Sequence, residues 1–215
     1  MELNKYIEHT LLKQDATKDE LLKLLDEAKE YKFLGVCVNP TNVKFSKNYL
    51  KDTDVKIVTV IGFPLGQNTC ESKVLETIDA VKNGADEIDM VINSGKLKDK
   101  ETNYIVDEIS SIKKACQGKI LKVILETDLL NSEEIKLACE LCVKAGADFV
   151  KTSTGFVKNG VGAKVEDVKL MFETVKDFGL GVKASGGVRD KDTAIAMINA
   201  GATRIGTSSG VKICS

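Results

Sequence analysis

The fold class is decided by the stretch NGADEIDMVIN, residues 83–93. Gly84 stands where a helix commonly ends in a left-handed residue, and the apolar run after it has the composition of a buried strand. The same join recurs as AGAD at 145–148 and as AGAT at 200–203. A helix end that leads at once into a strand, repeated along one chain, predicts parallel βα units.

Outward from this stretch, short β-rich runs alternate with amphipathic helical patterns along the whole chain. Two of the helices begin with capping boxes, Thr17 with Glu20 and Asn131 with Glu134. The sequence predicts eight strands, at Ile7–Leu12, Gly35–Val38, Lys56–Phe63, Glu87–Asn93, Ile120–Glu126, Phe149–Thr154, Gly181–Ser185 and Arg204–Thr207.

The length of the chain suits one architecture in particular. A minimal (β/α)₈ barrel needs about 200 residues, and the chain has 215. We therefore predict an α/β fold, a single (β/α)₈ TIM barrel that forms one domain over residues 1–215. A doubly wound open sheet shows the same alternation of elements and is the structural alternative.

The composition of the chain argues against nucleic-acid and membrane partners. Apolar residues make up 43% and charged residues 29% of the chain, and the formal net charge is -1. The basic residues are interspersed with acidic ones, so no nucleic-acid footprint is expected. The first residues lack the apolar core of a signal peptide, and no apolar stretch approaches the about 20 residues of a membrane span. We expect no membrane partner and a cytoplasmic location.

Cysteine and histidine usage argues against a metal site. The chain has six cysteines and one histidine, His9. The pair Cys139 and Cys142 has a C-x-x-C spacing, but it stands alone inside a helical pattern. We therefore expect no metal and no cofactor, and acid–base work is assigned to Lys, Asp, Glu, Tyr or Cys.

Four charged residues interrupt otherwise apolar strands. They are Asp89, Lys122, Lys151 and Lys183, one in each of four consecutive predicted strands. A charge in a buried parallel strand is costly unless it is paired or functional. The alternative is that each side chain points outward at a strand end and is solvated. Four in succession favour convergence inside a barrel, where active sites form at the C-terminal ends of the strands.

Three amines and one carboxylate indicate amine chemistry. A lysine attacks a carbonyl only as the neutral amine, and a second ammonium nearby or burial favours that form. Lys183, one strand along from Lys151, is expected to supply such a charge. Asp89 is expected to shuttle protons, with Lys122 as its counter-ion.

Glycine- and hydroxyl-rich segments follow the late strands. They are Thr154-Gly155, Ser185 to Arg189 and Gly206 to Ser209. Late loops of such barrels often bind phosphate through backbone N–H groups. Each segment alone fits a tight turn equally well, but three in successive units favour a phosphate site.

These segments carry a resemblance to a known family. VKTSTGF (150–156), VKASGGVR (182–189) and RIGTSSG (204–210) are similar to segments of deoxyribose-phosphate aldolases. The likeness continues in order through IEHTLLK (7–13), GVCVNP (35–40), TVIGFPLG (59–66), GADEIDMVIN (84–93) and LKVILET (121–127).

The resemblance implies reversible, metal-independent cleavage of 2-deoxyribose 5-phosphate into glyceraldehyde 3-phosphate and acetaldehyde. It implies Lys151 as the Schiff-base lysine, Asp89 as proton donor and acceptor, and Lys183 as the second lysine of the proton relay. Lys122 matches a lysine that orders the site, and Cys37 a bystander near the pocket. The positions implied for the substrate phosphate are Gly155, Gly186, Gly187, Arg189, Gly206, Ser208 and Ser209.

Two departures from the family pattern are visible. Glu8 stands where an aspartate is common, which bears on how a substrate hydroxyl is held. The chain ends at Ser215, directly after the eighth predicted strand, whereas some members have a longer tail ending in a tyrosine that assists proton transfer. The expectation is that this contribution is missing here.

Two other functions compete with this interpretation. One is another Schiff-base aldolase or transaldolase acting on a different sugar phosphate. The other is a catalytically silent barrel that only binds a sugar phosphate, which the presence of all four charged strand residues argues against. The expected partners are small sugar-phosphate and aldehyde substrates. A homo-oligomer, with a dimer as the working hypothesis, is a further expectation.

Overall fold

The computed structural model describes residues 1–215, in which eight parallel strands close into a barrel in chain order. The barrel closes between β1 and β8, where Ile7 pairs with Ile205 and His9 with Thr207. This closure confirms the (β/α)₈ prediction and excludes the open doubly wound sheet. The strands are β1 Ile7–Leu11, β2 Gly35–Val38, β3 Lys56–Ile61, β4 Glu87–Val91, β5 Ile120–Ile124, β6 Phe149–Lys151, β7 Gly181–Ser185 and β8 Arg204–Thr207.

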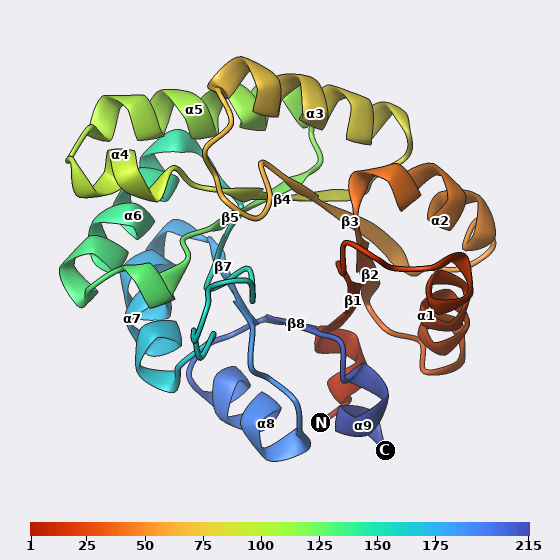
Figure 1. The fold of residues 1–215 in the computed structure, drawn as a ribbon. Coiled ribbons are helices and arrows are strands. Elements are labelled where there is room, and N and C mark those ends of the chain that lie inside the picture. Colours follow the sequence, from red (N-terminus) through yellow and green to blue (C-terminus); the bar gives the residue numbers. More distant parts are fainter.

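The helices form a ring outside the strands (Figure 1). The α-helices are α1 Lys18–Glu30, α2 Val43–Tyr49, α3 Cys70–Lys82, α4 Ser94–Lys98, α5 Thr102–Ala115, α6 Ser132–Ala145, α7 Val165–Val175, α8 Lys191–Asn199 and α9 Gly210–Cys214. Short 3₁₀ helices lie at η1 Leu3–Tyr6, η2 Pro40–Asn42, η3 Thr127–Leu129 and η4 Lys176–Phe178. None of the helices is long and apolar enough to cross a membrane.

The predicted helix boundaries rest on local chemistry that the structure shows. Thr17 and Asn131 each accept a hydrogen bond from the backbone N–H three residues on, and Glu20 and Glu134 bond back, so both capping boxes are confirmed. Gly84 has a φ of +103° and Gly201 a φ of +112°, a conformation that other residues rarely adopt. The chain therefore turns out of α3 and α8 directly into the next strand.

Five of the predicted strands were too long at their C-terminal ends. They end at Leu11, Ile61, Val91, Ile124 and Lys151, where the sequence predicted Leu12, Phe63, Asn93, Glu126 and Thr154. Most of the residues beyond are apolar or hydroxyl-bearing, as strand residues are, but the chain turns there to build the loops around the site. Gly62 and Glu126 have positive φ values of 62° and 58°, which breaks the sheet ladder. The eighth strand is also not the last element, because α9 follows it.

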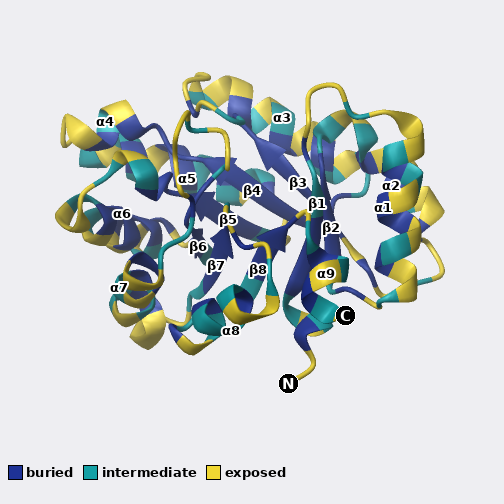
Figure 2. Cartoon of the chain, turned by 60° about the horizontal axis from the view of Figure 1, so that its bottom comes forward, coloured by how far each residue is buried: buried dark blue, intermediate teal, exposed yellow.

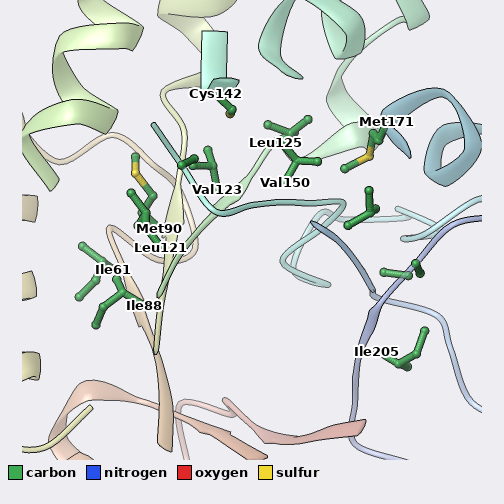
Figure 3. Packing of buried hydrophobic residues seen from close by; sticks show 14 of the residues in the cluster. Ile61, Ile88, Met90, Leu121, Val123, Leu125, Cys142, Val150, Met171 and Ile205 are labelled. Carbon is green, nitrogen blue, oxygen red and sulfur yellow. The ribbon is translucent and has the colours of Figure 1, made fainter. Parts of the chain in front are cut away.

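The main core lies between the barrel and the helices. Ile88, Met90, Val123 and Val150 are fully buried there, and Figure 3 shows them with other apolar side chains of this layer. Because side chains alternate across a strand, their neighbours Asp89, Lys122 and Lys151 point into the barrel. Figure 2 shows the strands mostly buried, with exposed residues mainly on the outer surface of the helices and on the loops.

Candidate active site

The four charged strand residues converge inside the barrel, as predicted. Asp89 is the register partner of Lys122 across β4 and β5, and Lys151 is the partner of Lys183 across β6 and β7. Asp89, Lys122 and Lys183 have no exposed surface, and Lys151 is 3% exposed. The reading in which these side chains are solvated at strand ends is therefore wrong.

Asp89 is the centre of the cluster. Its Oδ1 accepts a hydrogen bond from Lys122 Nζ at 3.0 Å. Its Oδ2 accepts one from Lys151 Nζ at 2.8 Å and another from Lys183 Nζ at 2.7 Å. The two late-strand amines thus share one carboxylate oxygen, and any proton that leaves one of them has an acceptor within hydrogen-bond reach.

Two further carboxylates belong to the cluster, and the sequence analysis did not place them there. Glu8, fully buried on β1, forms an ion pair with Lys183, and its Oε1 lies 3.4 Å from Lys122 Nζ. Glu87, at the start of β4, pairs with Lys122. Glu87 could have been found from its spacing, because residues two apart on a strand face the same side.

The carboxylates of the cluster are held ionised against their burial. Burial by itself raises the pKa of Asp89, but the ammonium groups of Lys122, Lys151 and Lys183 outweigh it and hold that pKa well below its usual range. The pKa of Glu8 is lowered in the same way, with burial opposed by Lys122 and Lys183. These carboxylates are therefore acceptors at neutral pH and can take up a proton only in transit.

The pKa values of two buried amines, those of Lys122 and Lys183, are shifted upward. Burial disfavours the charged form of Lys183, but Asp89 and Glu8 overcome it, and its pKa is raised above the usual value. The pKa of Lys122 is also raised, because Asp89 and Glu8 outweigh burial. Lys183 is thus a buried, charged amine beside Lys151, which is the geometry that the sequence analysis expected of it.

A cavity of about 300 Å³ opens above this cluster. Lys151 lines it, and so do six of the seven residues predicted for the substrate phosphate, namely Gly155, Gly186, Gly187, Arg189, Gly206 and Ser208. Ser209 is the exception, because it lies beyond the lining and its N–H donates to Thr207 Oγ1 at 2.9 Å. The loops after β6, β7 and β8 therefore form one pocket with the lysine at its floor.

The cavity has further lining residues that the sequence analysis missed. Thr10 and Lys13 come from the end of β1 and the loop after it, Ser153 and Phe156 come from the loop after β6, and Thr207 comes from the end of β8. The first strand thus supplies a wall opposite the late loops, which is a consequence of closing β1 against β8. Lys13 and Arg189 are the two cations in the lining apart from Lys151.

The remaining nucleophile near the cluster is Cys37. Its side chain is fully buried, and burial raises the pKa of the thiol to about 11. A thiol in this state is a poor nucleophile at neutral pH, because the thiolate is the reactive form. No group of three or more His, Cys, Asp or Glu side chains is arranged to hold a metal ion.

A closed parallel barrel with buried amines around one carboxylate, at the floor of a pocket built from late-strand loops, defines a barrel enzyme suited to carbonyl chemistry. Comparison with known proteins identifies which one. The DeoC/LacD family of aldolases matches residues 4–215, and the chain belongs to this family.

Relatives with curated names are similar over almost their full length. The deoxyribose-phosphate aldolase of Exiguobacterium sp. is 59% identical over 99% of this chain and 96% of its own. That of Enterococcus faecalis is 57% identical over 100% of this chain and 97% of its own. The tetrameric deoxyribose-phosphate aldolase of Aeropyrum pernix superposes with a TM-score of 0.91 at 36% identity, covering 99% of this chain and 89% of that chain.

Proposed function

We propose that this aldolase cleaves 2-deoxy-D-ribose 5-phosphate reversibly into D-glyceraldehyde 3-phosphate and acetaldehyde. One observation carries the proposal: of the three lysines bonded to the buried Asp89, only Lys151 lines the cavity, so this amine is open to a carbonyl and has a proton acceptor beside it. The names of the relatives, at 54–60% identity over nearly the whole chain, support the same substrate.

In the proposed mechanism Lys151, as the neutral amine, attacks C1 of the open-chain sugar. Loss of water from the carbinolamine leaves an iminium, which is the electron sink for the next step. A base removes the proton of the C3 hydroxyl, the C2–C3 bond breaks, and glyceraldehyde 3-phosphate leaves. The enamine that remains takes a proton at C2, and hydrolysis of the resulting iminium releases acetaldehyde and restores Lys151.

Proton transfer in this scheme belongs to Asp89 and Lys183. Asp89 is within 2.8 Å of the amine that gains and loses protons, and Lys183 is charged and bonded to the same carboxylate oxygen. Lys122 balances the charge of Asp89 and Glu8 from the other side of the network. In this proposal Lys122 orders the site and does not touch the substrate.

The products test the substrate assignment. We expect incubation with 2-deoxyribose 5-phosphate to yield acetaldehyde and glyceraldehyde 3-phosphate in equal amounts. Acetaldehyde is measured with alcohol dehydrogenase, and glyceraldehyde 3-phosphate is measured separately with triose-phosphate isomerase and glycerophosphate dehydrogenase. Transfer of a dihydroxyacetone unit between sugar phosphates, without acetaldehyde, would show a transaldolase instead.

Arg189→Ala should act selectively on phosphorylated substrate. Arg189 lines the pocket with the glycines of the β7 and β8 loops, and a charge-assisted hydrogen bond to an anion contributes roughly 1.5–3 kcal/mol. We expect the KM for 2-deoxyribose 5-phosphate to rise about tenfold or more, since about 1.4 kcal/mol corresponds to a factor of ten. Steady-state kinetics on unphosphorylated 2-deoxyribose provide the control, and an equal loss on both sugars would refute the phosphate site.

Chelators should leave the activity unchanged. The iminium of Lys151 replaces a metal as the electron sink, and the buried side chains offer no ligand cluster. Activity after extended dialysis against EDTA should equal that of an undialysed sample assayed in parallel. A loss that added zinc restores would contradict the proposed mechanism.

Three broader expectations remain proposals. Residues 1–215 are taken as a single aldolase domain, which the use of all eight strands in one barrel supports. A homodimer is a prediction that sedimentation of the purified protein would test. The cytoplasmic location likewise remains a prediction from the sequence.

A further inference from the structure

The segment between β6 and α7 is a long loop that forms one wall of the cavity. Thr154, Gly155 and Phe156 of this loop line the pocket that holds Lys151. Phe156 is 50% exposed, so the wall is not held in place by burial of its largest side chain. What fixes it must come from polar contacts at its two ends.

Glu126 holds the first end. This residue follows β5 in a left-handed conformation and is 4% exposed. One carboxylate oxygen accepts a hydrogen bond from the backbone N–H of Thr154 at 3.1 Å, and the other accepts one from the Thr154 hydroxyl. The neighbouring Thr127 N–H donates to Thr152 O at 3.0 Å, so the β5 and β6 loops are joined at several points.

Asp128 holds the second end. Its Oδ2 accepts a hydrogen bond from the N–H of Gly162 at 2.8 Å, and its Oδ1 accepts one from the N–H of Val161 at 3.3 Å. Asp128 itself does not line the cavity. Its carboxylate therefore acts on the loop and has no direct access to a ligand in the pocket.

The end that Asp128 fixes lies directly against the glycine turn after β7. Ala163 N–H donates to Gly186 O at 3.0 Å. A Cβ on Gly162 would collide with the backbone of Gly186, and a Cβ on Gly187 would collide with Val161 O. The two loops are thus packed backbone against backbone, and the position of one determines the position of the other.

We propose that Asp128 is a positioning residue that sets the selectivity of the enzyme for phosphorylated substrate. By fixing Val161 and Gly162, it holds the Gly186–Gly187 turn, whose backbone faces the cavity beside Arg189. This inference rests on the proposed phosphate site, and it assigns the rigidity of that site to a residue outside the pocket. Preorganised backbone N–H groups bind an anion better than mobile ones, because less conformational entropy is lost on binding.

The test compares two sugars in Asp128→Ala and Asp128→Asn. For Asp128→Ala we expect the KM for 2-deoxyribose 5-phosphate to rise about tenfold, as for the loss of charge-assisted hydrogen bonds, with kcat nearly unchanged. Inhibition by inorganic phosphate should weaken by the same factor, and kcat/KM for unphosphorylated 2-deoxyribose should stay at the wild-type value. Asp128→Asn keeps one acceptor oxygen, so it should recover part of the loss.

Two controls make the outcome decisive. Asp86→Ala removes a carboxylate that accepts a backbone N–H, that of Ile57 at 2.9 Å, at the opposite end of the barrel. It should lower the Tm and leave the ratio of kcat/KM for the two sugars unchanged. Arg189→Ala, measured in parallel, separates the two ideas. A selective loss in Arg189→Ala with none in the Asp128 variants overturns the positioning role, whereas no selectivity in Arg189→Ala overturns the phosphate site itself.

Discussion

Lys151→Arg should reduce turnover by on the order of 10⁴-fold or more, as the loss of a covalent nucleophile does in other enzymes. Arginine keeps a positive charge beside Asp89, with which Lys151 Nζ forms a 2.8 Å hydrogen bond, so the charge balance of the buried network is retained. It remains protonated in proteins and cannot form an imine. The expected loss is therefore chemical and not a result of misfolding, and the Tm should stay close to that of the wild type.

Reductive trapping measures the same assignment directly. Incubation of the wild type with acetaldehyde and borohydride should add one ethyl group, located at Lys151 by peptide mass spectrometry, and the variant should remain unlabelled. Lys158→Arg is the matched control, because Lys158 is an exposed lysine of the same loop. Labelling of Lys122 or Lys183 in the wild type would overturn the assignment of Lys151.

The barrel and the charged cluster were predictable because they depend on local patterns. Repeated helix ends at Gly84, Gly146 and Gly201 predicted the βα units, and charges in four consecutive apolar strands favoured the convergence of Asp89 and Lys122 inside the barrel. Convergence then followed from barrel closure alone. The length of the chain suited eight units, but the closure of β1 against β8 is what excludes the open sheet.

What the sequence did not predict depends on contacts between distant segments. Glu8 on β1 meets Lys183 on β7 only because β1 closes the barrel against β8. Asp128 lies in the short helix η3 and accepts the N–H of Gly162 in the long loop after β6, and no periodic pattern in the sequence predicts that these two segments meet. The C-terminal ends of five strands were predicted too late for a related reason. Glu126, for example, directly follows an apolar strand segment in the sequence, but its backbone is left-handed and belongs to the loop after β5.

Asp89→Asn should separate imine formation from proton transfer. Asparagine has the same shape but is neither a base nor a counter-ion, so kcat should fall by about 10²–10⁴-fold, the usual contribution of a general acid–base group. Without the carboxylate, the neutral form of each neighbouring amine becomes more favourable. Trapping at Lys151 should therefore persist even though turnover is lost.

The same substitution should cost stability in a pH-dependent way. Asp89 is fully buried and hydrogen-bonded to three ammonium groups, and removing one partner from a buried ion pair typically costs about 3–5 kcal/mol. The folded-state pKa of Asp89 lies well below the unfolded value of about 3.9. Its stabilisation is therefore fully present above that unfolded value and is lost as the pH falls through the folded-state pKa. The difference in unfolding free energy between wild type and variant should be constant from neutral pH to about pH 5 and shrink only in stronger acid.

Urea denaturation across this pH range, combined with kinetics and trapping, distinguishes the two roles of Asp89. Asp148→Asn is the matched control, because Asp148 is part-buried, and asparagine can keep accepting the Leu121 N–H at 2.7 Å while losing the charge that pairs with Lys113. Ion pairs outside the core contribute only about 0–1 kcal/mol. If Asp89 were only a structural counter-ion, the variant would lose stability while a correctly folded fraction kept the wild-type kcat. If it were only a base, kcat would fall and the unfolding free energy would match that of Asp148→Asn. The geometry, with one carboxylate bonded to all three lysines, requires both losses together, and the absence of either would contradict the central position given to Asp89.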